Sequence, residues 1–131
     1  MSDLFIFSLC RIRTLKLGKD HLKVADGHLN MVDVHLKRGE HNMALLRLEE
    51  VLRIKRLKLG NNSEDVANTI YSIGIVYNAK KDVKMALQKF EEALSVFIAA
   101  GCPSEHPQVA TLMRMIKLLE QRKMGTKWPK F

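Results

Sequence analysis

Apolar residues recur every three or four positions along much of the chain, which is the spacing of an amphipathic helix. Between residues 66 and 79 the apolar positions are Val66, Ile70, Ile73 and Tyr77. A polar break follows at residues 80–82, and a second pattern of the same kind ends near Gly101. The pattern therefore predicts two helices joined by a short turn.

The same arrangement is expected earlier in the chain, with helices over residues 24–37 and 43–59 and a turn at residues 38–40. Gly60 is a typical helix stop, and Ser63 offers a side-chain cap to the next helix. A further helix begins at Pro107, which suits a first turn, and runs to about Arg122. Small residues stand where the two helices of a hairpin must approach closely, namely Gly74, Ala86 and Ala93.

The chain repeats itself at a shift of 42 residues. Residues 11–18 recur as residues 53–60, and 15 of the 42 positions in residues 11–52 are identical to their counterparts in residues 53–94. A third copy opens at Ser95 and carries one extra residue near Pro103. Such agreement does not arise by chance, and it indicates a tandem array of helix pairs.

Short segments that recur with this period carry a resemblance to a known family. They are Val66-Ala67, Ile73-Gly74, Tyr77, Asp82, Ala86, the segment from Phe90 to Leu94, the linker from Lys58 to Gly60, and the segment from Glu105 to Ala110. Over roughly residues 9–122 the chain resembles the tetratricopeptide repeat in the long, 42-residue form of kinesin light chains and nephrocystin-type proteins. The resemblance implies an all-α solenoid of antiparallel helix hairpins with about six helices.

The resemblance also divides the chain into parts. Residues 1–20 match the second half of a truncated repeat, residues 21–60 and 61–101 are two repeats, residues 102–124 are the first helix of a further repeat, and residues 125–131 are a basic tail. Phe5 and Phe7 fall where the other copies hold charged residues, so both are expected to face solvent. We expect self-association through such uncapped ends, and the alternative, a piece of a longer array, stays open.

The function that the resemblance implies is protein–protein interaction, as a scaffold or adaptor. In such arrays the first helix of each repeat lines a concave groove that holds a peptide or helix of a partner. The matching positions are Asp26, Leu29, Asn30, Asp33, Leu36 and Lys37 in the first copy, Asn68, Tyr71, Ile75 and Asn78 in the second, and Thr111, Arg114, Leu118, Gln121 and Arg122 in the third. Of the paired asparagines that family repeats carry in this helix, the chain keeps only Asn30.

The charge of the chain narrows the choice of partner. It holds 22 Lys and Arg against 14 Asp and Glu, for a formal charge of +8. Much of the excess lies at helix ends that repeat with the period, where cations complement the macrodipole. We expect an acidic protein or peptide partner. RNA is the alternative, although stacking sites interleave aromatics with cations, and only Trp128 beside Lys127 and Lys130 offers that.

Signatures of catalysis are missing from the sequence, which holds no Gly-rich phosphate loop, no GxSxG and no HExxH. We therefore expect no enzyme, no cofactor and no metal. Cys10 and Cys102 fit neither a disulfide framework nor a zinc spacing, so they are interpreted as reduced thiols, Cys10 in the core and Cys102 in a loop. No apolar run reaches the roughly 18 residues of a membrane span, and we expect a cytoplasmic protein.

Histidines raise one further hypothesis, since His21, His28 and His35 recur at a spacing of seven. A metal site is one interpretation. However, His28 and His35 match Ile70 and Tyr77 of the next copy. We therefore expect packed or half-buried rings there. His106 precedes a helix, where a role at the helix N-terminus is expected.

Overall fold

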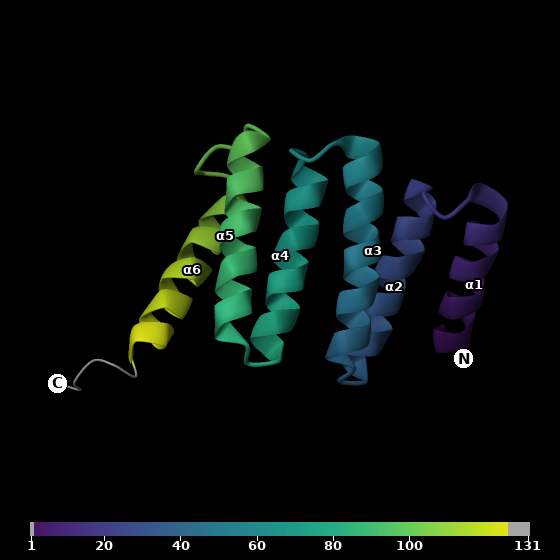
Figure 1. The fold of residues 1–131 in the computed structure, drawn as a ribbon, viewed down its shortest axis with the longest axis horizontal. Coiled ribbons are helices and arrows are strands. Elements are labelled where there is room, and N and C mark those ends of the chain that lie inside the picture. Colours follow the sequence, from purple (N-terminus) through teal and green to yellow (C-terminus); the bar gives the residue numbers. More distant parts are fainter. Residues whose placement is uncertain (1, 126–131) are drawn as a thin grey trace. The chain divides into compact units, whose positions relative to one another are not determined.

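The computed structural model describes the backbone of residues 2–125 and the side chains of residues 3–122. Within that range it contains no strand and six α-helices: α1 (Ser2–Leu17), α2 (Leu22–Lys37), α3 (His41–Leu59), α4 (Glu64–Ala79), α5 (Val83–Ala99) and α6 (Pro107–Gly125) (Figure 1). The predicted number of helices is confirmed. Most of the predicted basic tail, including Trp128 with Lys127 and Lys130, lies outside the described residues.

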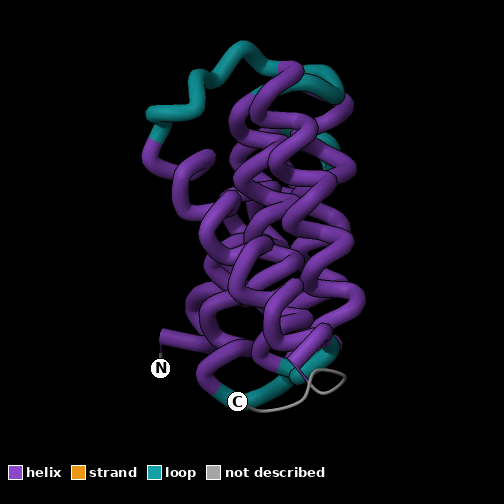
Figure 2. Tube along the Cα trace, turned by 90° about the vertical axis from the view of Figure 1, so that its left-hand side faces the viewer, coloured by secondary structure: helices purple, strands orange, loops and turns teal. Residues whose placement is uncertain are grey.

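The chain forms two compact units that divide between Asn61 and Asn62. The first unit holds α1, α2 and α3, and the second unit holds α4, α5 and α6. Within each unit, helices that are consecutive in sequence pack against one another. Figure 2 shows that helix makes up nearly all of the drawn chain, with loops only as connections. Each unit is thus one helix hairpin with one further helix beside it.

Side chains cap the starts of four helices. Ser63 Oγ accepts the N–H of Val66 at 3.1 Å, and Asp82 Oδ1 accepts that of Met85 at 3.1 Å. His21 and His106 do the same through Nδ1, accepting from Lys23 at 3.0 Å and from Gln108 at 3.2 Å. The predicted roles of Ser63 and His106 are confirmed.

Because an N-cap satisfies a donor that the helix leaves without a partner, the caps also set the helix boundaries. The cap at His21 places the start of α2 at Leu22, two residues before the predicted position. At the other end of the chain, α6 extends to Gly125, beyond the predicted end at about Arg122.

The hairpin of the second unit is built on contact between a glycine and an aromatic ring. A Cβ atom added to Gly74 of α4 would lie 2.6 Å from Cε1 of Phe90 in α5, closer than real contacts allow. Phe90, Ala86 and Ala93 of α5 are all fully buried. The prediction that small residues allow close approach at Gly74 is confirmed.

The hairpin of the first unit is built on aliphatic side chains. Val51 and Ile54 of α3 form a buried cluster with Val24 and Ala25 of α2. On the other side of α2, a Cβ atom added to Gly27 would lie 3.0 Å from the Cys10 sulfur of α1. Cys10 is buried, as expected for a small core residue.

The two phenylalanines near the start of α1 differ in their surroundings. Phe5 is 67% exposed, as predicted. The prediction for Phe7 is wrong, because its ring is half-buried edge-on against His35 of α2, with centroids 5.7 Å apart. His35 is itself buried, as expected, and its Nδ1 lies 2.9 Å from Glu40 Oε1. The aromatic contact turns Phe7 toward α2 and away from solvent.

The turns inside the two hairpins share one backbone conformation. Gly39 has a φ of 73° in the turn between α2 and α3, and Lys81 has a φ of 67° in the turn between α4 and α5. These positions are 42 residues apart and therefore equivalent. A positive φ suits glycine and strains a residue with a Cβ atom, so the second turn carries strain that the first does not.

Candidate protein-binding surfaces

The expected binding positions of the first copy lie on one face of α2. Asp26, Asn30, Asp33 and Lys37 are exposed, and together they form a polar strip of mixed charge. Leu29 and Leu36 are half-buried, and Leu29 packs against the core cluster of its own hairpin. These two leucines therefore offer a partner less apolar surface than the sequence predicts.

In the second copy the expected positions lie on α4 and are all half-buried: Asn68, Tyr71, Ile75 and Asn78. The Tyr71 ring lies 5.7 Å from that of Phe90, and its hydroxyl donates to the Met115 sulfur of α6 at 3.6 Å. The Tyr71 hydroxyl therefore contacts α6 within the second unit.

The expected positions of the third copy lie on α6 and are mostly open to solvent. Arg114, Gln121 and Arg122 are exposed, and Leu118 is 57% exposed. Thr111 is half-buried and donates its hydroxyl to the Pro107 carbonyl at 2.8 Å. An exposed leucine between exposed cations is the chemistry expected for an acidic, partly apolar ligand.

Two asparagines of α4 have an unusual environment. Oδ1 of Asn68 and Oδ1 of Asn78 are enclosed, and no donor among the described residues reaches either atom. A buried acceptor without a donor costs on the order of 1–3 kcal/mol. Both residues belong to the expected binding positions, but in this structure their oxygens are enclosed and do not reach the surface.

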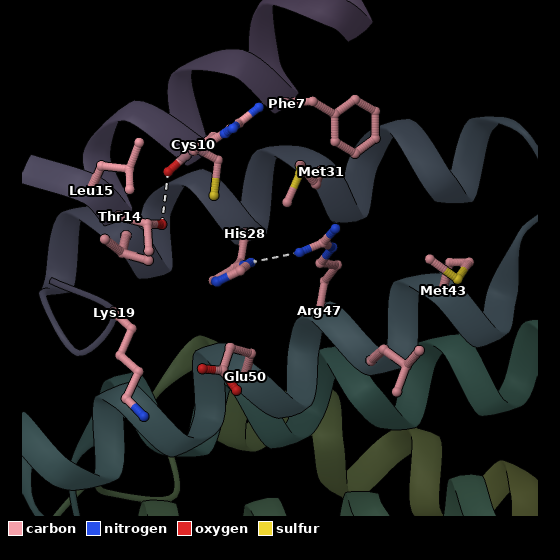
Figure 3. Close-up of a pocket in the computed structure, with 13 residues that line it drawn as sticks. Phe7, Cys10, Thr14, Leu15, Lys19, His28, Met31, Met43, Arg47 and Glu50 are labelled. Atoms are coloured by element: carbon pink, nitrogen blue, oxygen red, sulfur yellow. Dashed lines mark hydrogen bonds between the residues drawn. The ribbon is translucent and has the colours of Figure 1, made fainter.

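A cavity of about 630 Å³ that opens to solvent lies elsewhere, in the first unit between α1, α2 and α3 (Figure 3). Val24, His28 and Met31 of α2 form part of its lining. By helical periodicity they lie on the opposite side of α2 from Asp26 and Asp33. None of the expected binding residues lines this cavity. It was not predicted from the sequence.

Charged groups surround the cavity. His28 Nδ1 lies 3.4 Å from Arg47 Nη1 (Figure 3), and burial, followed by the Arg47 charge, lowers the pKa of His28. Hydrogen bonding to Arg53 lowers the pKa of Glu50. Arg53 also donates to Asp20 Oδ1 at 2.7 Å, and this bond lowers the pKa of that carboxyl as well. The two carboxylates near the cavity are thus both paired with the same guanidinium.

One group of metal-ligand types occurs among the described side chains, formed by Glu64, Cys102 and His106, whose ligand atoms lie within 4.8 Å of one another. His106 Nδ1 accepts the N–H of Gln108, so the ring proton is on Nε2, which lies 3.0 Å from Glu64 Oε1. Neither ring nitrogen then has a lone pair free for an ion. In this arrangement His106 caps α6 and connects it to the start of α4.

The sequence period, the helix hairpins and their contacts define the class of all-α repeat proteins built from helical hairpins. The tetratricopeptide repeat family matches residues 23–99, which is more than half of the chain, and the chain belongs to this family. The predicted fold class is thereby confirmed. Repeats of this family generally mediate protein–protein interaction and typically form non-enzymatic scaffolds.

Comparison with solved structures shows the same fold. The crystal structure of BtubC (BKLC) from P. vanneervenii is 18% identical to this chain with a TM-score of 0.67. The match covers 98% of this chain and 59% of that one, so this chain spans well under two thirds of its length. No curated protein matches the sequence. Among the described residues, no helix is long and apolar enough to cross a bilayer.

Proposed function

We propose that this protein is a scaffold or adaptor module that docks a segment of a partner protein on the first helices of its repeats, on α2 in the first unit and on α4 and α6 in the second. The observation that carries the proposal is the surface that α4 and α6 share in the second unit. There Tyr71, half-exposed Ile75 and exposed Leu118 supply apolar contacts, and the Tyr71 hydroxyl contacts the Met115 sulfur across the two helices. A kinesin light chain-like role in cargo binding is the finer form of this proposal.

The polar groups on the same surface support a peptide as the ligand. Arg114 and Arg122 are exposed on α6, which favours an acidic segment. The unpaired oxygens of Asn68 and Asn78 require donors, and the main-chain N–H groups of an extended peptide supply them once the amides rotate outward. An acidic peptide with apolar side chains therefore satisfies both the cations and the orphaned acceptors.

The test is selection of a random dodecapeptide display library on the full chain, followed by calorimetric titration of the enriched peptides. Tyr71→Ala and Arg114→Glu should each weaken binding by about tenfold or more, which corresponds to about 1.4 kcal/mol. Lys84→Glu, a charge reversal at an exposed position of α5, is the matched control and should leave binding unchanged. Peptides that bind the two α4/α6 variants as tightly as the parent protein would contradict the proposal.

A second titration with a short RNA at about 50 and 200 mM salt separates this function from the RNA alternative. Nanomolar RNA binding that collapses with salt and survives Tyr71→Ala would replace the proposed function with nucleic-acid association. Self-association through α1 stays a prediction, and sedimentation of the parent protein tests it.

A further inference from the structure

One face of the first unit, here named its outer face, carries exposed leucines that the second unit lacks at the equivalent positions. Leu4 and Leu15 of α1 and Leu46 and Leu57 of α3 expose between 60% and 76% of their surface. Leu4 is equivalent to Leu46, and Leu15 to Leu57, at the shift of 42 residues. In α5 of the second unit the same two positions hold Gln88 and Ala99. The leucines are therefore a property of the first unit and not a requirement of the repeat.

Of these four leucines, here named the outer leucines, two belong to the cavity. Leu15 and Leu46 line the cavity itself. Eleven residues, close to three helical turns, separate the two leucines of each helix, so both lie on one side of it. At a rise of 1.5 Å per residue the two leucines of each helix lie about 16 Å apart, and the positions between them on that side are polar: Ser8 and Arg11 in α1, and Glu50 and Arg53 in α3. Such a length exceeds one side chain and matches about three turns of a bound helix.

The cavity provides a place for an anchoring side chain next to the outer leucines. At about 630 Å³ it is within the range of ligand pockets, and Met31 and Met43 contribute thioether side chains to its lining. Methionine adapts its shape to different partners because its side chain is unbranched and flexible. An aliphatic or aromatic side chain of a partner would therefore find an apolar and adaptable surface here.

The charged residues that line the cavity indicate the kind of partner that would bind there. Arg11, Lys19 and Arg47 line the cavity, and neither Arg11 nor Lys19 forms an ion pair with any described residue. Glu50 is the one carboxylate in the lining, and it shares the Arg53 guanidinium with Asp20. The three cations of the lining therefore outnumber the one negative charge that remains on the group of Arg53, Glu50 and Asp20, and the mouth carries a net positive charge. Carboxylates on the rim of a docked segment would balance it.

From these observations we propose that the outer face of the first unit is a second docking site, which binds an acidic amphipathic helix of a partner protein. The apolar side of that helix lies between the outer leucines and places one large side chain in the cavity, and its glutamates or aspartates face Arg11, Lys19 and Arg47. The site is independent of the α4/α6 surface, so one chain can hold two partners.

The experiment uses two synthetic peptides of about 18 residues, five turns of helix. Both carry leucines and one tryptophan at helical spacing, and the remaining positions are glutamate in one peptide and lysine in the other. Fluorescence anisotropy with the full chain should show saturable binding of the acidic peptide and at least tenfold weaker binding of the basic one. Amide shifts in an NMR titration should cluster in residues 7–15 and 43–50.

Variants of exposed Arg11 and Leu46 and of half-buried Arg47 test the site without changing a fully buried side chain. Arg11→Glu and Arg47→Glu should each weaken the acidic peptide about tenfold, and Leu46→Gln, which copies Gln88, should weaken it severalfold. Tyr71→Ala and Arg114→Glu are controls that should leave this binding unchanged. The variants that weaken binding therefore show which of the two proposed sites, the outer face or the α4/α6 surface, is wrong.

Three results would overturn the proposal. Equal binding of the two peptides, or no saturable binding of the acidic one, removes the charge argument. Sedimentation that shows a dimer, lost on Leu15→Gln, assigns the face to a second copy of the chain. Stoichiometric binding of dodecanoate together with no peptide binding assigns the cavity to a small anionic amphiphile.

Discussion

The two helix hairpins, α2–α3 in the first unit and α4–α5 in the second, solve one packing problem with opposite distributions of volume. The first places Val32 on α2 and Leu48 on α3, both buried. The second places Gly74 at the position of Val32 and Phe90 at that of Leu48. The smaller side chain on α4 is thus accompanied by a larger side chain on α5. The comparison teaches that the pair of residues, and not either residue alone, is what the repeat requires.

The hairpins also differ in polarity. His28 and His35 of α2 stand where α4 has Ile70, which is fully buried, and Tyr77. The first unit therefore keeps imidazole rings next to Arg47 and Glu40, whereas the second unit has an aliphatic side chain and a phenol at the equivalent positions. The cavity with its cations lies in the first unit, and the Tyr71–Met115 contact lies in the second. Similar helices thus support different surfaces.

The largest expected effect comes from breaking the volume balance. Gly74→Val gives α4 the residue of α2 and forces a Cβ atom to 2.6 Å from the Phe90 ring. We expect a loss of about 3 kcal/mol in the free energy of unfolding, at the upper end for overpacking. The double variant Gly74→Val/Phe90→Leu copies the Val32–Leu48 pair and should recover most of this loss. Urea denaturation of the three proteins measures both, and simple additivity of the two changes would contradict the comparison.

A smaller effect should come from exchanging the turn residues. Lys81→Gly relieves a φ of 67° and should stabilise the protein by about 0.5–1 kcal/mol, because Lys81 is exposed and loses no packing. The reverse change, Gly39→Lys at a φ of 73°, should cost a similar amount. Thermal denaturation of both variants checks the pair. If both substitutions raise stability, or both lower it, the two turns are not equivalent.

The smallest effect at neutral pH is expected from His28→Ile, which copies Ile70 and should change stability by less than about 1 kcal/mol. The pH dependence of stability is the property that this variant should change. Because burial lowers the pKa of His28 below 6.5, the unfolded chain binds a proton first, and stability falls as the pH drops below about 6.5.

Removing the ring should make that fall shallower. Arg47→Ala removes only the second cause of the lowered pKa and should reduce the slope less than His28→Ile does. Urea midpoints between about pH 5 and 7.5 measure the slopes. An unchanged slope in His28→Ile would show that other groups cause the loss of stability in acid.

The helices, the repeat and the packed histidines were predictable because each follows from local spacing or from comparison of equivalent positions. Ser63 and His106 could be identified as caps, since a polar residue directly before an apolar period has few other roles. The prediction for Phe7 was made from the equivalent position, Glu49, which is exposed. It was wrong because the Phe7 ring packs edge-on against His35, and no other copy has an aromatic pair at these positions.

The cavity could not be predicted, because it depends on the separation of α1 and α3 and not on the type of any one residue. The sequence does contain one indication of this surface, the pairs of leucines spaced 11 residues apart, which the structure shows to be exposed. That spacing was not interpreted from the sequence. The extent to which Leu29 and Leu36 contribute to the core was also beyond prediction, since both lie at the edge of the apolar side of α2.

The contact between Gly74 and Phe90 also fixes the order in which mutations can accumulate. A lineage that passes from the glycine–phenylalanine pair to the valine–leucine pair must shorten the ring first and tolerate a small void. The reverse order begins with a steric clash, so selection would remove the intermediate before its compensating change could arise. Each half of this hairpin therefore sets which substitutions the other half accepts.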